Sequence, residues 1–206
     1  MSLKLLTKRP GAAALPPKER ILAAAASLFY RHGIRAVGVD AIAEAAGTNK
    51  MTLYRHFASK DELVAEYLRH SASQTDSCWA MLEKRYPGDA LAQLRGWLRG
   101  AAEVVADCDM RGCALANAAV ELPEKDHPAR RVIEIHKTGH LGRLAELARA
   151  AGLKDPEMLA DELHLLLEGA RVTAQSVGRE GLGERVVRMG EALIAAHASG
   201  RWQASD

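Results

Sequence analysis

The chain has 206 residues, of which 48% are hydrophobic and 26% are charged, a balance that is typical of folded globular proteins and excludes an intrinsically disordered chain. Its apolar runs are shorter than the roughly 20 residues of a membrane-spanning helix, and no secretion signal follows the basic N-terminus, so we expect no membrane partner. The three cysteines, Cys78, Cys108 and Cys113, are too sparse and odd a set for a disulfide framework, which favours a cytoplasmic location.

The formal net charge of +2 conceals an uneven distribution of charge along the chain. Residues 1–60 contain ten Lys and Arg against three acids, whereas the remainder contains eighteen basic and twenty-three acidic residues. A basic first part on a mildly acidic body is typical of a protein whose N-terminal part contacts a polyanion such as DNA. Uneven surface charge is common in other proteins too, so the asymmetry alone does not establish DNA binding.

The beginning of the chain predicts a short lead followed by three helices. Residues 1–15 are basic and contain Gly and Ala, as in a flexible N-terminal lead. The apolar residues that follow recur at helical spacings, and Pro, Gly and Asn residues mark the ends of each run. The expected helices run from Pro16-Pro17 to His32-Gly33, over 39–46 and over 50–57.

The rest of the chain continues with the same helical periodicity. Ser59 and Glu62 belong to a capping box, in which Ser59 caps the next helix and Glu62 reaches back. That helix is expected to end near Arg85, and breaks rich in Gly and Pro separate the later ones. These later helices are expected over 89–107, 113–122, 127–151, 156–177 and 183–198. Strand signals are almost absent, so the sequence predicts an all-α fold of about nine helices.

The second and third expected helices are joined by a tight turn at Gly47, which is typical of a helix-turn-helix. If Leu53 and Phe57 point inward, the later helix presents outward Lys50, Met51, Thr52, Tyr54 and Arg55. The first turn of a helix has free amides and a positive dipole end, so Lys50 and Thr52 are expected near base edges, and Arg55, one turn on, at the DNA backbone. Any helical protein contains short helix pairs, so this pattern alone leaves DNA binding open.

The residues from Lys18 to Leu63 resemble the N-terminal domain of the TetR family of regulators. The matching residues stand in family order and spacing, and they are Ile21, Ala24, Leu28, Phe29, Gly33, Val39, Ile42, Ala43, Ala46, Gly47, Leu53, Tyr54, Phe57, Lys60 and Leu63. The resemblance implies a three-helix DNA-binding head over 16–62 on a helical body over 63–206, which dimerises and usually holds an effector pocket. We therefore expect a homodimer that binds a double-stranded DNA operator and a small-molecule effector, without a cofactor or a catalytic site.

Carried over by position, the recognition helix is Lys50–Phe57, and Tyr54, His56 and Lys60 are expected mainly at phosphates. The full set that is expected to contact DNA is Thr48, Asn49, Lys50, Met51, Thr52, Tyr54, Arg55, His56 and Lys60. The chain departs from the family pattern at Gly38, which is a weaker helix cap, at Thr48-Asn49 and at Met51. Met51 can touch a thymine methyl group or simply lengthen the helix surface, so the operator cannot be taken from a relative.

The body offers no motif of comparable specificity. The resemblance implies that its last two helices form a four-helix dimer interface, with candidate residues Leu159, Leu163, Leu166, Leu167, Ala170, Val177, Val186, Leu193 and Ile194. The alternative for these residues is internal core, and both uses are expected. Effector-pocket candidates combine bulk or a polar tip with apolar surroundings, namely Trp79, Leu82, Trp97, Asn117, Glu121, His140 and Gln175. Core packing or a solvated face is the alternative for each.

The leading hypothesis is a homodimeric repressor that a small-molecule effector releases from a near-palindromic operator. His136 and His140 are four apart and can share a metal ion, but no matched carboxylate or cysteine is identifiable nearby, so we expect no metal. Cys108 and Cys113 can form a redox switch, although burial as small apolar residues is commoner. A metal- or redox-sensing body and an architectural DNA binder without an effector therefore remain as alternatives. An enzyme is not expected, because no nucleophile with a base and no phosphate-binding loop is found.

Overall fold

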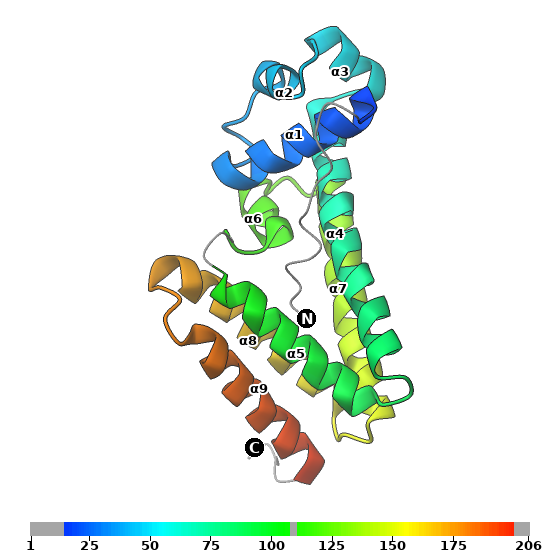
Figure 1. Ribbon diagram of the computed structural model, residues 1–206, viewed down its shortest axis with the longest axis vertical. Coiled ribbons are helices and arrows are strands. Elements are labelled where there is room, and N and C mark those ends of the chain that lie inside the picture. The colour runs from blue at the N-terminus through cyan, green and yellow to red at the C-terminus, as the bar shows by residue number, and fades with distance from the viewer. Residues whose placement is uncertain (1–14, 108–110, 200–206) are drawn as a thin grey trace. The chain divides into compact units, whose positions relative to one another are not determined.

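A computed structural model describes residues 15–107 and 111–199 of the chain (Figure 1). Within these residues the fold is all-α, as predicted, and no predicted helix end differs from the observed one by more than about a residue. None of the described helices is long and apolar enough to cross a membrane. The helices are α1 Pro17–His32, α2 Val39–Ala45, α3 Lys50–His56, α4 Lys60–Arg85, α5 Ala90–Ala106, α6 Ala114–Glu121, α7 Pro128–Ala150, α8 Pro156–Ser176 and α9 Leu182–Ser199.

The chain divides into two compact units, and each is built from separate stretches of sequence. Among the described residues, the head unit comprises 15–74 and 113–136, so it contains α1, α2, α3, α6, the beginning of α4 and the beginning of α7. The body unit comprises the described residues of 75–112 and 137–199, and contains α5, α8, α9 and the remainders of α4 and α7. The head unit therefore extends beyond the segment 16–62 that was predicted to bind DNA.

The head unit packs around apolar side chains that recur at helical spacings. Ile21, Ala25 and Phe29 lie on one face of α1 and are buried. They join Ile42 of α2 and Leu53 of α3 in one core, to which α4 and α6 add Leu63, Val64, Leu68, Leu115 and Ala118. Each fully buried Leu, Ile or Phe stabilises the fold by about 1.5–3 kcal/mol relative to an exposed one. The head is thus held together by packing, with α6 as part of its core.

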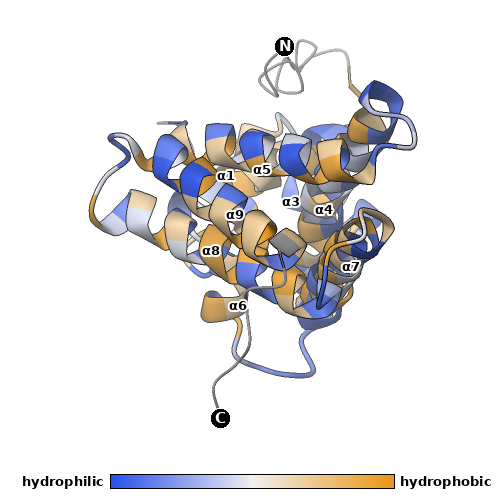
Figure 2. Cartoon of the chain, turned by 90° about the horizontal axis from the view of Figure 1, so that it is seen from below, coloured by the Kyte–Doolittle hydropathy of each residue, from blue (hydrophilic) through white to orange (hydrophobic). Residues whose placement is uncertain are grey.

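The body unit has a second core, in which α5, α8 and α9 run beside one another (Figure 1). Each of these helices carries both hydrophobic and hydrophilic residues, seen as orange and blue in Figure 2, as expected of helices with one buried face. Leu98 of α5 and Leu163 of α8 are almost fully buried. Gly190 of α9 lies against Leu98, so closely that a β-carbon added to the glycine would lie 2.6 Å from the leucine methyl carbons. The absence of a side chain at Gly190 is what allows α9 to approach α5.

Candidate nucleic-acid interface

Two short helices of the head unit, α2 and α3, are joined by a tight turn at Gly47. Gly47 has a φ of 62°, which is a left-handed conformation that a glycine adopts without strain. Asn49 caps α3, because its side-chain oxygen accepts a hydrogen bond from the Thr52 N–H at 2.9 Å. Leu53 and Phe57 are buried, as predicted from their spacing. The sequence thus folds locally into a helix-turn-helix whose second helix has a fixed start and a fixed inner face.

The outer face of α3 is open to solvent. Lys50, Met51, Tyr54, Arg55 and His56 are exposed, and Thr48 and Thr52 at its start are partly exposed. No acidic residue stands in the first turn of α3, so the positive end of the helix dipole is not neutralised from within that turn. The Lys50 ammonium lies 3.2 Å from the Asp40 carboxylate, but both side chains are more than half exposed, and such a pair contributes about 0–1 kcal/mol. A DNA phosphate can therefore compete for Lys50 at little cost.

The start of α4 shows the predicted capping box. The Ser59 hydroxyl accepts a hydrogen bond from the Glu62 N–H at 3.0 Å. The Glu62 carboxylate accepts one from the Ala58 N–H at 2.6 Å, one residue before the N–H that such a box ordinarily uses.

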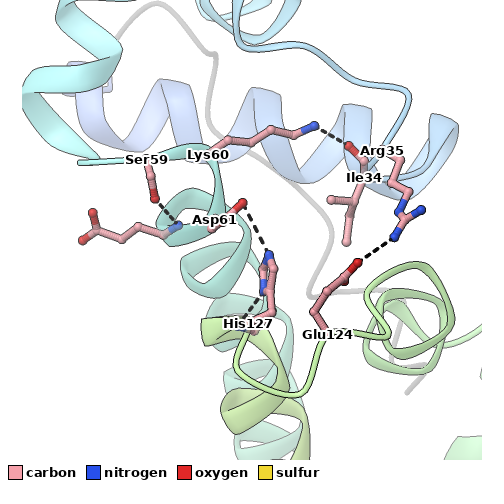
Figure 3. A network of polar contacts seen from close by, with 9 residues as sticks. Ile34, Arg35, Ser59, Lys60, Asp61, Glu124 and His127 are labelled. Atoms are coloured by element: carbon pink, nitrogen blue, oxygen red, sulfur yellow. Dashed lines mark hydrogen bonds and ion pairs between the residues drawn. The ribbon is translucent and has the colours of Figure 1, made fainter.

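Lys60, which was expected at a DNA phosphate, has a partner inside the protein. Its ammonium donates a hydrogen bond to the Ile34 carbonyl at 2.7 Å (Figure 3). The ammonium also lies 6.0 Å from the centre of the Phe29 ring. The side chain is partly buried and connects the start of α4 to the turn that follows α1. The sequence could not reveal this contact, because Lys60 and Ile34 are 26 positions apart.

The same turn is held from the other side by α6. The Glu121 carboxylate accepts hydrogen bonds from the Ile34 N–H at 2.7 Å and from the Arg35 N–H at 3.0 Å. The Arg35 guanidinium also donates to the Glu124 carboxylate at 3.1 Å. His127 lies beyond, with Nε2 3.4 Å from the Asp61 carboxylate at the start of α4 (Figure 3). The segment 121–127 is thus bonded to the α1–α2 turn and to α4, all within the head unit.

The seven residues predicted for an effector pocket do not form one group. Trp79, Trp97 and His140 come together in the body unit: the two indoles are stacked with ring centres 6.0 Å apart, and the imidazole lies 5.5 Å from each. Leu82 belongs to the same hydrophobic core. Asn117 and Glu121 lie in the head unit, and Gln175 is exposed and donates to a backbone carbonyl of its own helix.

His164 of α8 joins this aromatic cluster, 6.1 Å from His140, although sequence reasoning missed it. Burial lowers the pKa of the His164 imidazole, and the positive charge of Lys137 lowers it further. Lys137 lies 2.9 Å from Glu168. Burial by itself would raise the pKa of the Glu168 carboxyl, but the hydrogen bond from Lys137 and the charge of Arg171 more than offset it, so the net shift is downward. The stacked rings of this cluster therefore lie near a partly buried ion pair, Lys137–Glu168, whose charges act on His164.

The residues predicted for the dimer interface or the internal core differ in how far they are buried within the protomer. Six of them are buried inside the protomer, where they form the core of the body unit, namely Leu159, Leu163, Leu167, Ala170, Val186 and Ile194. Leu166 and Leu193 are partly buried, and Val177 is exposed. The large exposed apolar residues of the last two helices are Met158, Leu165, Val172 and Met189. A leucine repeat identifies the buried face of a helix, but not whether its own chain or a second copy covers that face.

The metal-sensing and redox-sensing alternatives depend on clusters of His, Cys and acidic side chains. Among the residues that the structure describes, no group of three or more His, Cys, Asp or Glu side chains has the arrangement of a metal site. Cys113 stands at the start of α6 as a free, partly buried thiol, and Cys108 lies outside the described residues.

Comparison with known proteins decides the family. The protein-family model described as "Bacterial regulatory proteins, tetR family" matches residues 21–67 of the sequence. A solved structure from Streptomyces avermitilis, assigned to the TetR regulators, is 30% identical and has a TM-score of 0.75, over 89% of this chain and 99% of that one. The chain belongs to the TetR family.

Two further relatives agree with this TetR-family membership. A TetR-family transcriptional regulator from Streptomyces coelicolor has a TM-score of 0.83 and 28% identity, over 88% of this chain and 96% of that one. The regulator AcrR of Shigella flexneri is 32% identical over 78 residues, which are 38% of this chain and 36% of that protein. The chain thus spans only about a third of the length of this curated relative.

The TetR-family assignment agrees with the geometry of α2 and α3. The protein is a DNA-binding transcriptional regulator and not an enzyme. TetR-family regulators bind DNA operators and act as dimers.

Proposed function

We propose that the protein is a homodimeric repressor that leaves a near-palindromic operator when a small-molecule effector binds its body unit, and that it acts in the cytoplasm. The observation that carries this proposal is the open outer face of α3, held by the Asn49 cap and the buried Leu53. Two such helices in a dimer would enter successive major grooves about 34–36 Å apart. This spacing is what makes a near-palindromic operator the expected target.

The proposed DNA surface consists of Thr48, Asn49, Lys50, Met51, Thr52, Tyr54, Arg55 and His56. The residues of the first turn of α3 are assigned to base edges, and Tyr54, Arg55 and His56 to phosphates. For Lys60 we replace the phosphate role with a positioning role, because its ammonium donates to the Ile34 carbonyl.

The proposed dimer surface lies on the exposed apolar side of α8 and α9. Met158, Leu165 and Val172 follow one another at seven-residue spacing, so they lie on one face of α8. Met189 adds an exposed apolar side chain on α9. Burying such exposed apolar side chains against a second copy of the chain is favourable. The buried leucines of α8 pack behind this surface, inside the protomer.

The proposed effector site is the cluster of Trp79, Trp97, His140 and His164 in the body unit. Large aromatic rings with a few polar groups are typical of small-molecule sites. An effector bound there would release the operator only to the extent that it binds the DNA-free state more tightly than the DNA-bound state.

An anisotropy titration against the DNA upstream of the protein's own gene tests the proposal. The titration is run at two salt concentrations, with scrambled DNA of the same length as competitor. Tight and salt-sensitive binding that prefers the upstream DNA supports a specific regulator, and a promoter reporter then distinguishes repression from activation. Equal affinity for both DNAs would point instead to an architectural DNA binder.

A further inference from the structure

The large exposed apolar side chains of the DNA-binding segment lie on the recognition helix α3. Among the described residues up to 62, the large hydrophobic side chains that are exposed are Met51, at 68%, and Tyr54, at 44%. They are three positions apart on α3, so they lie on the same face of the helix. The opposite face carries Leu53, which is fully buried. The segment up to residue 62 therefore has its large exposed apolar side chains where the DNA is proposed to bind.

Met51 stands in the first turn of α3, where recognition helices meet base edges. Of the two neighbours of Met51, Lys50 is an exposed cation and Thr52 is partly buried, so Met51 is the exposed apolar side chain of this turn. The Met51 sulfur lies 4.0 Å from a guanidinium nitrogen of Arg55, one turn further on. The thioether therefore lies beside Arg55 on the outer face of the helix.

The chemistry of a thioether limits what it can recognise. Methionine has no hydrogen-bond donor, and its sulfur is only a weak acceptor, so it cannot form the paired hydrogen bonds by which Arg or Asn read guanine or adenine. The apolar group that distinguishes one base pair from another in the major groove is the C5-methyl group of thymine. We infer that Met51 contacts this methyl group and thereby requires a thymine at one symmetric position in each half of the operator. The inference rests on the proposed function.

Burial of one methyl group against Met51 corresponds to about a fourfold gain in affinity. A symmetric dimer makes the contact twice, so loss of both methyl groups is expected to weaken binding about fifteenfold.

The test uses binding sites that the purified full-length protein selects from a random-sequence duplex library. Each thymine of the selected site is then replaced by deoxyuridine, which removes only the methyl group. At one thymine of each half-site, replacement by deoxyuridine in a single half-site is expected to lower the affinity of the wild type about fourfold. The same replacement should leave the affinity of Met51→Ala unchanged. Met51→Leu keeps an apolar side chain and should keep the thymine. Met51→Gln should select adenine instead, because its amide can pair with the adenine edge.

Two controls separate the inference from the proposed function. Thr52→Ala should retain the sensitivity to deoxyuridine, and the Met51 variants should melt at the wild-type temperature, since the side chain is exposed. A wild type that selects a defined site but tolerates deoxyuridine at every thymine would overturn the role of Met51 and leave the regulator intact. Failure to select any defined site would overturn the proposed function and this inference with it.

Discussion

Replacing Glu121 by alanine is expected to loosen the turn between α1 and α2. The carboxylate accepts two backbone N–H groups, from Ile34 at 2.7 Å and from Arg35 at 3.0 Å. A hydrogen bond to a charged group contributes about 1.5–3 kcal/mol when it is shielded from solvent. The Arg35 N–H is exposed, so water replaces most of its bond, whereas the Ile34 N–H is partly buried. The Glu121→Ala variant should therefore lose about 2 kcal/mol, and Glu121→Gln, which keeps an acceptor oxygen but loses the charge, about half as much.

The matched control is Glu124→Ala in the same segment. Glu124 bonds to the Arg35 side chain, and both groups are more than half exposed, so its loss should cost less than about 0.5 kcal/mol. Two kcal/mol correspond to a fall of about 4–8 °C in the melting temperature of a protein of this size.

Amide hydrogen exchange tests the same contact locally. Exchange of the Ile34 and Arg35 N–H groups should accelerate up to about thirtyfold in Glu121→Ala, if their opening becomes easier by the full amount, and should be unchanged in Glu124→Ala. A Glu121→Ala variant that melts like the wild type, with unchanged exchange at these two amides, would refute the reasoning. It would mean that the core of the head holds the turn without α6.

Three further predictions concern other parts of the chain. Gly190→Ala should destabilise the protein by about 1–3 kcal/mol in urea unfolding, because Leu98 must move to admit the methyl group, and an unchanged midpoint would contradict the close packing. Burial, followed by a neighbouring lysine, lowers the pKa of His164, so the folded state binds a proton less readily than the unfolded state. The free energy of unfolding should therefore fall as the pH drops below about 6.5, and it should fall less in His164→Gln than in the wild type. Equal losses in the two proteins would exclude His164 as the cause. Lys60→Ala should lower the melting temperature yet keep the salt dependence of DNA binding, whereas Arg55→Ala should reduce its slope by about one counterion. A reduced slope in Lys60→Ala would restore the phosphate role.

The helices were predictable because their signals are local. Pro17 stands in the first turn of α1, Gly33 follows its end, and Ser59 with Glu62 marks the start of α4. Each of these signals acts through backbone groups at most four positions away, so the sequence contains all that is needed. The inner face of α3 followed in the same way from the spacing of Leu53 and Phe57.

Contacts between distant segments were not predictable. Glu121 was assigned to an effector pocket, whereas its carboxylate binds a backbone N–H group 87 positions away in the sequence. The leucines of α8 were predicted to serve a dimer seam or the internal core, and the sequence could not tell that Leu163 is buried in its own chain whereas Leu165 is exposed. In both cases the residue type gives the chemistry of the contact, but only the packing of the helices gives the partner.

The bonds between α6 and the α1–α2 turn determine how this head can be exchanged between regulators. A chimera joined at residue 62 would transplant the Ile34 and Arg35 N–H groups without the Glu121 carboxylate that accepts from them. It would also separate the buried residues of α1 from Leu115 and Ala118, which complete their core. A graft that takes residues 113–136 together with the N-terminal segment keeps both sets of contacts. Operator specificity in this protein is therefore portable as two pieces of chain, not one.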